Sequence, residues 1–291
     1  MFVCCGCCFS LQSQHLQFAR RLCMKSLRIS LLHLAPVPGE IGANRRLLEH
    51  ATRIAASQGA DWVVSPELAV CGYGFSHLIG TDWITPEPNQ WMSSFCEVVK
   101  SLGVNVFLSH PERDPQDKAL YNSVFFIDSR GAICARHRKI NTISDGWSAA
   151  GNVIEPVDWG GIKIGILVCA DAYSSRVADT LRSKGARILV SPAAWGPGLY
   201  GPNGEWEQRT LETGLPLIVC NRTGKDSTRS FCGAESLVVV SGQKVLRHVS
   251  PNSVVLTFDW DIENMALLSG EFIKHGLEPR QPSSARLNGA T

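Results

Sequence analysis

Residues 162–191 read IKIGILVCADAYSSRVADTLRSKGARILVS, and this stretch indicates the fold class. The run at 162–169 is mostly apolar and rich in Ile and Val, which predicts a buried strand. A helical pattern follows over 175–184, stops at Gly185 and leads into a second apolar run at 187–191. A strand, a helix and another strand in this order are typical of an α/β protein with parallel strands.

The same alternation of apolar runs and helical patterns continues through most of the chain. We expect strands, which share this apolar and β-branched character, at 27–35, 61–66, 104–110, 123–128, 162–169, 187–191, 215–220, 235–240 and 254–259. We expect amphipathic helices at 44–58, 91–102, 175–184 and 206–213. Helix-free tracts add antiparallel pairing, so the sequence predicts two sheets stacked face to face with helices outside.

Composition excludes several classes of protein. The chain has 291 residues, of which 44% are hydrophobic and 19% charged, so it is too apolar to be disordered. Its 28 basic and 26 acidic residues give a formal net charge of +2, which offers no electrostatic reason to expect a nucleic acid as partner. Nowhere do 18 apolar residues run together, as a spanning helix requires. We therefore expect a soluble protein with neither a nucleic-acid nor a membrane partner.

Cysteine is unevenly distributed along the chain. Of the 11 cysteines, five lie in the first 23 residues, at Cys4, Cys5, Cys7, Cys8 and Cys23. The other six are widely spaced and mostly sit in apolar runs, where cysteine usually packs as a small hydrophobe; they are Cys71, Cys96, Cys134, Cys169, Cys220 and Cys232. This usage fits a reducing compartment, so we expect a cytoplasmic protein.

Residues 1–26 contain basic residues and no acidic ones. Their interleaved C-x-x-C pairs lack the second set of ligands that a structural zinc site needs, and the basic residues follow the apolar ones, unlike in a secretory signal. S-acylation of these cysteines is an open alternative. We favour an unstructured extension, or an upstream start with Met24 opening the domain. The predicted organisation is then a Cys-rich extension over 1–26, a domain over 27–269 and a flexible tail over 270–291.

Three segments carry side chains suited to covalent catalysis. Cys169 ends an apolar strand before a helical pattern, where a helix amino terminus lowers the pKa of a thiol and where Asp171 is a candidate helix cap. Glu67 directly follows Pro66 at the end of another strand, and Lys139 ends a basic run. Each has an ordinary alternative: a packed cysteine, a glutamate in a solvated loop and a lysine on a solvated basic face.

Taken together, the three segments resemble a known family. Glu67, Lys139 and Cys169, in that order and within Pro-Glu-Leu, Arg-Lys-Ile and Val-Cys-Ala-Asp, resemble the catalytic residues of the nitrilase superfamily of carbon–nitrogen hydrolases. Further matching fragments lie at 121–122, Gly151, 191–195, Arg209, Glu212 and 221–224. The resemblance covers about residues 27–259 and implies a four-layer αββα sandwich that pairs into a homodimer or a higher homo-oligomer.

The resemblance also implies a chemistry and a substrate class. Cys169 would attack a carbonyl carbon, Glu67 would act as the base, and Lys139 with the backbone amide of Ala170 would stabilise the oxyanion. The expected substrate is a small non-peptide amide or an N-carbamoyl compound. Neither a metal nor an organic cofactor is required. Among aromatic residues in the adjacent loops, Tyr73, Tyr173 and Trp195 are candidate substrate contacts, as are Trp147 and Tyr200.

The chain departs from the family pattern at two positions. Many members carry a second glutamate between the lysine and the cysteine, and here Asp145 is the candidate replacement. The nitrile-hydrolysing branch has Trp-Glu after the cysteine, whereas this chain has Ala170-Asp171, which favours amides. A nitrile-hydrolysing or acyl-transferring relative and a non-catalytic member that binds a ligand or protein remain alternatives.

Two competing motifs are weaker. Residues 196–201 fit the G-x-G-x-x-G string of dinucleotide sites, but Pro197 and Pro202 disfavour the required turn into a helix. His137, close to Lys139, is the one histidine expected near the site, so a Cys/His hydrolase is a second candidate.

Overall fold

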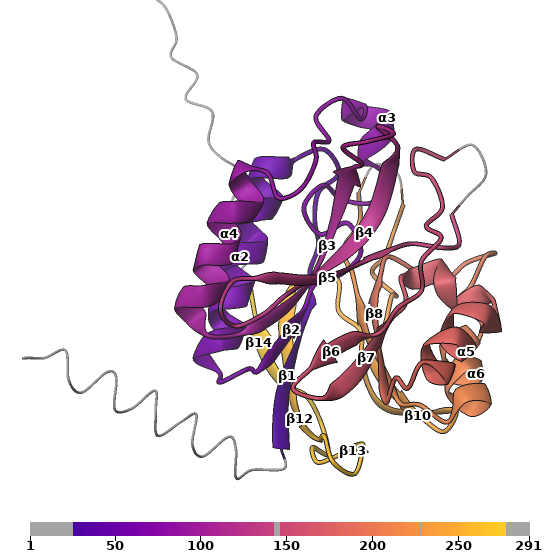
Figure 1. Ribbon diagram of the computed structural model, residues 1–291. Coiled ribbons are helices and arrows are strands. Elements are labelled where there is room, and N and C mark those ends of the chain that lie inside the picture. Colours follow the sequence, from indigo (N-terminus) through magenta and orange to yellow (C-terminus); the bar gives the residue numbers. More distant parts are fainter. Residues whose placement is uncertain (1–25, 143–145, 227–228, 278–291) are drawn as a thin grey trace, which may run out of the picture.

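The computed structural model describes residues 26–142, 146–226 and 229–277, which form two facing β-sheets with helices on their outer sides (Figure 1). One sheet has eight strands in the order β13-β12-β1-β2-β3-β4-β5, with β14 pairing to β12. Its strands are β1 (Ser26–His33), β2 (Trp62–Val64), β3 (Asn105–Arg113), β4 (Leu120–Ile127), β5 (Ile133–Arg138), β12 (Val254–Asp261), β13 (Ala266–Leu267) and β14 (Ile273–Gly276).

The second sheet has six strands in the order β11-β10-β9-β8-β7-β6. They are β6 (Val157–Trp159), β7 (Ile162–Ile166), β8 (Ile188–Ala193), β9 (Leu217–Asn221), β10 (Ser236–Val240) and β11 (Gln243–His248). Each sheet has a parallel centre, β1-β2-β3 in the first and β7-β8-β9 in the second, and antiparallel strands flank both centres. The carboxyl ends of the central parallel strands carry the loops that build the site described below.

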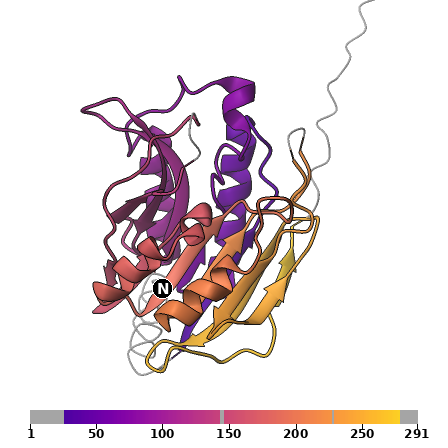
Figure 2. The same cartoon turned by 90° about the vertical axis from the view of Figure 1, so that its right-hand side faces the viewer.

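Helices cover the two outer faces, which gives four layers. Helices α2 (Ile41–Ser57) and α4 (Gln90–Leu102) lie on the larger sheet, whereas α5 (Ser175–Ser183) and α6 (Glu205–Thr213) lie on the smaller one (Figures 1 and 2). A short helix α3 (Phe75–Ile79) and a 3-10 helix η1 (Cys169–Tyr173) complete the described elements. This arrangement confirms the predicted αββα sandwich.

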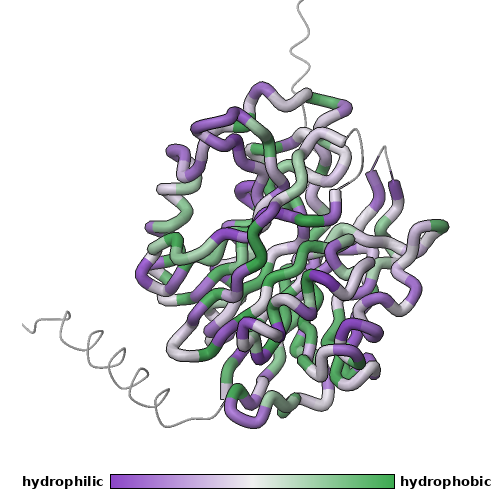
Figure 3. Tube along the Cα trace, turned by 45° about the vertical axis from the view of Figure 1, so that its right-hand side comes forward, coloured by the Kyte–Doolittle hydropathy of each residue, from purple (hydrophilic) through white to green (hydrophobic). Residues whose placement is uncertain are grey.

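The space between the sheets is filled by apolar side chains that alternate along the strands. Figure 3 shows this hydrophobic centre as green segments enclosed by more polar surface loops. Ile29 and Leu31 from one sheet and Ile164 and Ile166 from the other are all fully buried in one cluster. Trp62 joins them and makes edge contacts with Phe107 and Trp159. Among the described residues, no helix is long and apolar enough to cross a membrane.

Local sequence explains where the helices begin and end. The Asn89 side chain accepts a hydrogen bond from the Met92 amide at 2.9 Å and caps α4, and Gly103 ends that helix with a left-handed backbone at φ 67°. The predicted helices are all present, with bounds that differ by at most three residues at their starts. Helix α2 buries one face, including Leu48, Ala51 and Ala55, against the outer side of the larger sheet.

Five strands, all at sheet edges, lie outside the predicted set: β5, β6, β11, β13 and β14. Strand β11 is exposed at most positions, and β5 alternates half-buried with exposed ones, so neither shows the apolar run that identified the other strands. Strand β6 has only three residues and pairs with β7 across Gly160 and Gly161. The strand predicted to reach Cys169 ends at Ile166, because the backbone then leaves the sheet and enters η1 at Cys169.

The stretch predicted as a flexible tail from residue 270 begins with ordered structure. Phe272 is 4% exposed and packs edge-on against Phe258, and β14 pairs antiparallel with β12. The predicted boundary at 269 therefore falls before the last strand, whose side chains are exposed and gave no apolar signal. Residues 1–25 and 278–291 lie outside the described residues, so the division into extension, domain and tail stays a prediction.

We expect Phe272→Ala to lower the free energy of unfolding by about 3–5 kcal/mol, because it empties a buried aromatic position between β12 and β14. Ile273→Ala is the control: its side chain is 51% exposed, so a change within about 0.5 kcal/mol is expected. Urea denaturation of both variants measures the difference. Equal, small effects would show that the segment after residue 269 contributes nothing to the fold.

Candidate active site

Glu67 occupies a buried position where the two sheets meet. It follows β2 by three residues and is 0% exposed, and its backbone amide donates to the carbonyl of Ala193 at the end of β8, at 3.2 Å. Its Oε1 accepts from Lys139 Nζ at 2.6 Å and from Asn122 Nδ2 at 2.8 Å. Its Oε2 accepts from the backbone amide of Ala194 at 3.1 Å. The alternative of a solvated loop glutamate is therefore wrong: Glu67 is a fully buried carboxylate with donors on both oxygens.

Lys139 follows directly after β5 and is 7% exposed, so it is not on a solvated basic face. Its backbone amide donates to Asn122 O at 2.8 Å, and its carbonyl accepts from Gly151 N at 2.7 Å. A Cβ at Gly151 would lie 2.4 Å from Arg138 O, so only glycine allows this approach. Burial alone would lower the pKa of Lys139, but the charge of Glu67 outweighs it and holds that pKa above its ordinary value. The ammonium therefore stays charged.

Cys169 is the first residue of η1, and its backbone is left-handed at φ 48°, a conformation that is strained for a non-glycine residue. The side chain is 5% exposed, and Glu67 and the backbone amide of Ala194 lie close enough to act on its pKa. Burial, and next the charge of Glu67, raise the pKa of this thiol although Lys139 opposes them. The lowering expected from a helix amino terminus is wrong, since η1 is a single short 3-10 helix and a carboxylate lies beside the sulfur.

Asp171 ties the segment of Cys169 to the segment of Lys139. Its Oδ2 accepts from Val168 N at 2.9 Å and from His137 Nε2 at 3.0 Å. Its Oδ1 accepts from the backbone amides of Ile140 and Asn141 at 2.9 and 2.8 Å. Asp171 was predicted to cap the following helix; instead, its four hydrogen bonds form a junction between the two sheets. His137 serves this junction, and no contact with Cys169 supports a Cys/His pair.

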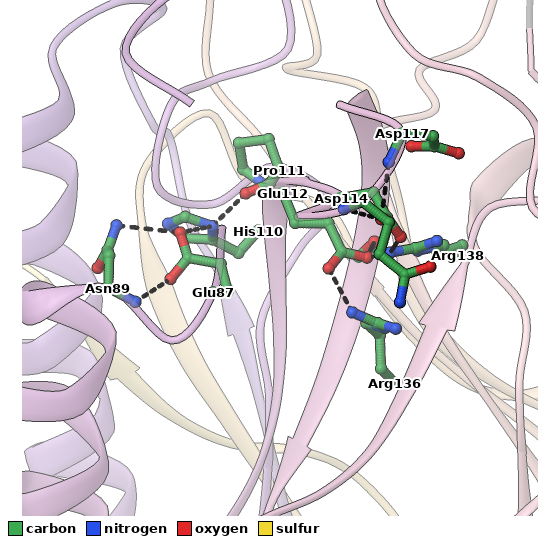
Figure 4. Close-up of polar contacts among 11 residues, drawn as sticks. Glu87, Asn89, His110, Pro111, Glu112, Asp114, Asp117, Arg136 and Arg138 are labelled. Atoms are coloured by element: carbon green, nitrogen blue, oxygen red, sulfur yellow. Dashed lines mark hydrogen bonds and ion pairs between the residues drawn. The ribbon is translucent and has the colours of Figure 1, made fainter. Parts of the chain in front are cut away.

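A second buried carboxylate organises the basic run before Lys139 (Figure 4). Glu112 on β3 is 1% exposed and accepts from Arg136 Nη1 and Arg138 Nε, both at 2.7 Å, and from Ser123 Oγ at 2.7 Å. Arg138 also binds Asp114 Oδ2 at 2.8 Å and stacks over the Tyr121 ring. These charge-assisted bonds fix the end of β5 and therefore the position of the next residue, Lys139.

A cavity of about 780 Å³ opens beside this cluster. Its described lining residues are Leu68, Tyr73, Gly74, Ser76, His77, Gly80, Thr81, Asn122, Lys139, Thr142, Gly146, Trp147, Ser148 and Arg229. Asn122 and Lys139, the two side chains that bind Glu67, form part of its wall. Burial, followed by the charge of Glu67, raises the pKa of Tyr73 to about 12, so its hydroxyl stays protonated.

The candidate substrate contacts divide into two groups. Tyr73 lines the cavity, as does Trp147, whereas Ala170, Tyr173 and Trp195 are not among its described lining residues. Tyr173 and Trp195 pack against each other with ring centroids 4.7 Å apart. Both also hydrogen bond to the carbonyl of Tyr200. These aromatic residues thus support the loop beside Cys169.

Some site features could not be read from sequence. Asn122 was noted only as a matching fragment, yet it binds Glu67 directly and its Oδ1 is buried with no partner among the described residues. The Ala194 amide is a backbone group and leaves no residue-type signal. Asp145 lies outside the described residues. Within the described ranges, no group of three or more His, Cys, Asp or Glu side chains is arranged to hold a metal ion.

Comparisons with known proteins show what this chain is similar to. A family model described as carbon-nitrogen hydrolase matches residues 28–267. A glutamine-dependent NAD(+) synthetase of Thermotoga maritima is 24% identical over 252 residues, which cover 82% of this chain but only 43% of that protein. A protein named nitrilase from Pyrococcus abyssi is 28% identical over 229 residues, covering 77% of this chain and 85% of the other.

Solved structures show the same fold. An amidase from Nesterenkonia sp. superposes with a TM-score of 0.70 at 22% identity and covers 81% of this chain and 90% of its own. Nit3 of Saccharomyces cerevisiae, described as a member of branch 10 of the nitrilase superfamily, superposes with a TM-score of 0.73 at 18% identity, covering 82% and 91%.

We expect Asp171→Asn to lower the free energy of unfolding at pH 7 by roughly 3 kcal/mol, because a buried acceptor of four hydrogen bonds loses its charge. Although burial opposes it, hydrogen bonding led by His137 lowers the pKa of Asp171. A lowered folded-state pKa stabilises the fold above the unfolded value, about 4, and this contribution disappears as pH falls through the folded value. The difference between wild type and variant should therefore shrink below about pH 4.

Denaturant titrations between pH 3 and pH 7 measure this difference. Asp179→Asn is the control, because Asp179 is an exposed aspartate on α5. A gap between wild type and Asp171→Asn that is constant with pH would contradict the role of the Asp171 charge.

Proposed function

Because this chain belongs to the carbon-nitrogen hydrolase family, we propose that it hydrolyses the carbon–nitrogen bond of a small non-peptide amide or N-carbamoyl compound through a thioester on Cys169. One observation carries the proposal: a buried lysine–glutamate pair, 2.6 Å apart, lies beside a buried thiol on a strained turn. The wall of an open cavity contains the lysine of that pair. Acyl transfer needs a nucleophile, a base and an oxyanion stabiliser, and these three groups supply them.

The first step uses Glu67 as the base. Because burial and the Glu67 charge raise the pKa of Cys169, the resting thiol is protonated and a poor nucleophile. Glu67 accepts the thiol proton as the sulfur attacks the carbonyl carbon, so that no free thiolate has to form beforehand. The Glu67 carboxylate is close enough to Cys169 to act on its pKa, so the proton has a short path between them.

The tetrahedral intermediate carries a negative oxygen that needs donors. Lys139 has three N–H groups, and the one bound to Glu67 leaves the others for the oxyanion. We assign the backbone amide of Ala170 as a second donor, since it follows the nucleophile directly. Protonated Glu67 then gives its proton to the leaving nitrogen, the C–N bond breaks and the thioester remains.

Water completes the cycle. Glu67, again a carboxylate, removes a proton from a water that attacks the thioester carbon. The C–S bond breaks, the sulfur recovers the proton, and the acid product leaves. The sum is one amide and one water converted to one acid and one amine or ammonia, without metal or cofactor.

We favour an amide over a nitrile as the substrate. Asp171, two residues after Cys169, uses both carboxylate oxygens in structural hydrogen bonds and offers no group to a substrate. The amidase of Nesterenkonia and proteins named formamidase, such as one from Bacillus cereus that is 27% identical over 144 residues, favour the same choice. A homo-oligomer in the cytoplasm remains part of the proposal. The cytoplasmic location is supported by the six cysteines of the described residues, which are all unpaired.

We expect Cys169→Ala to abolish turnover while changing the melting temperature little, because only a sulfur atom in a buried pocket is removed. An ammonia-release assay across amides, N-carbamoyl amino acids and nitriles measures activity, and thermal unfolding measures stability. Cys96→Ala is the matched control, since Cys96 is 7% exposed, compared with 5% for Cys169, and lies on α4. An active Cys169→Ala variant would refute the mechanism.

Lys139→Met should lower kcat by about 10²–10³, the usual effect of losing one oxyanion donor. It should also destabilise the fold by roughly 3–5 kcal/mol at pH 7, because Glu67 stays buried without its cation. The raised pKa of Lys139 means that its contribution to stability is complete below the unfolded value, about 10.4, and is lost as pH rises through the folded value. As the pH rises above 10, the free energy of unfolding should therefore decrease less for Lys139→Met than for wild type.

Lys100→Met, which removes an exposed lysine on α4, is the control for both measurements. Wild-type activity in the Lys139→Met variant would contradict the oxyanion role, and unchanged stability would contradict the buried ion pair.

A further inference from the structure

The described residues that line the cavity include positively charged side chains but no negatively charged ones. They include Lys139, Arg229 and the titratable His77, and none of them is an aspartate or glutamate. Lys139 is already paired with Glu67 at 2.6 Å, so that pair is close to neutral. Arg229 forms no ion pair with any described carboxylate. Among the described residues, the positive charge of Arg229 therefore has no carboxylate partner in this wall.

Arg229 lines the same cavity as Lys139 and contacts the ring of Tyr73. Its guanidinium carbon lies 5.4 Å from the centroid of the Tyr73 ring, within cation–π range. Its backbone amide donates to Asp226 Oδ1 at 2.9 Å, and Asp226 in turn pairs with buried Arg222 at 3.0 Å. The backbone of Arg229 is thus linked, through Asp226, to the buried side chain of Arg222.

Tyr73 lines the cavity together with Lys139 and Arg229. Besides burial, the charges of Glu67, Lys139, Cys169 and Arg229 act on its pKa. A small substrate whose carbonyl oxygen is bound by Lys139 would have its far end toward Arg229, which lines the same cavity. Tyr73, Leu68 and Trp147 supply the apolar walls between these two points.

We propose that the substrate is an amide with an anionic group, most simply a carboxylate, at its other end, and that Arg229 binds this group. The inference rests on the proposed hydrolase function and narrows its substrate class. A guanidinium offers a planar fork of N–H donors that matches a carboxylate, and both its positive charge and its exposed position suit an incoming anion. The anionic group takes no part in bond breaking; it orients the amide toward Cys169.

A pair of nearly isosteric substrates isolates this effect. Succinamate carries one amide and one carboxylate, whereas succinamide carries two amides and no charge. The ratio of their kcat/KM values is measured for wild type, Arg229→Gln, Arg229→Lys and the control Arg53→Gln, whose arginine lies on α2 and pairs with Glu49. Arg53→Gln removes the same unit of charge from another surface.

We expect the succinamate-to-succinamide ratio to fall roughly ten- to hundredfold in Arg229→Gln, as for loss of a hydrogen bond to a charged group. The ratio for Arg229→Lys should lie between those of Arg229→Gln and wild type, because lysine keeps the positive charge but lacks the planar pair of N–H donors. Arg53→Gln should keep the wild-type ratio. A ratio that is the same in wild type and Arg229→Gln, or an equal fall in Arg53→Gln, would overturn the inference.

Alkylation of Cys169 tests the anion site without requiring hydrolysis. Iodoacetate and iodoacetamide differ only in carrying a carboxylate or an amide, and peptide mass spectrometry measures the labelling rate of each at Cys169. We expect the iodoacetate-to-iodoacetamide rate ratio to fall several-fold in Arg229→Gln relative to wild type and Arg53→Gln. An unchanged ratio would count against the anion site.

The two experiments separate the two proposals. If no amide is hydrolysed but Arg229→Gln still lowers the alkylation ratio, the hydrolase proposal fails and the anion site is supported. If amides are hydrolysed and both ratios are insensitive to Arg229, the hydrolase proposal stands and the anion site is refuted.

Discussion

The buried ion pair between Glu67 and Lys139 is the constraint on which the site depends. Two charges removed from water lose their hydration, so each must find close partners in the protein. Glu67 receives three donors, from Lys139, Asn122 and the Ala194 amide. The pair therefore holds its geometry only while loops from both sheets stay in register.

The connections around this pair explain why a sandwich suits the site. Asp171 joins the end of β5 in one sheet to the turn after β7 in the other, and Glu67, beyond β2, bonds to the end of β8. Glu112 anchors the arginines that precede Lys139. Apolar packing between the sheets sets their separation, so the polar links need not carry the fold alone. A rigid frame of this kind can hold catalytic groups with little reorganisation.

Burial also sets the protonation states. It keeps the Cys169 thiol neutral, while the negative charge beside Lys139 keeps that ammonium charged. A neutral nucleophile next to an available carboxylate is suited to proton transfer during attack. Arg229 and Tyr73, by contrast, lie on the cavity wall, where they can select a substrate without disturbing these states.

Sequence alone was sufficient for the fold class and for the order of Glu67, Lys139 and Cys169, because buried strands, amphipathic helices and short motifs are local patterns. The edge strands β5 and β14 were not predicted, because β5 alternates half-buried with exposed residues, β14 is exposed, and neither shows an apolar run. The direction of the Cys169 pKa shift, the junction at Asp171 and the cavity that contains Arg229 arise from residues distant in the chain. Those features were decided by tertiary packing, since burial and the distance between charges exist only once the two sheets have come together.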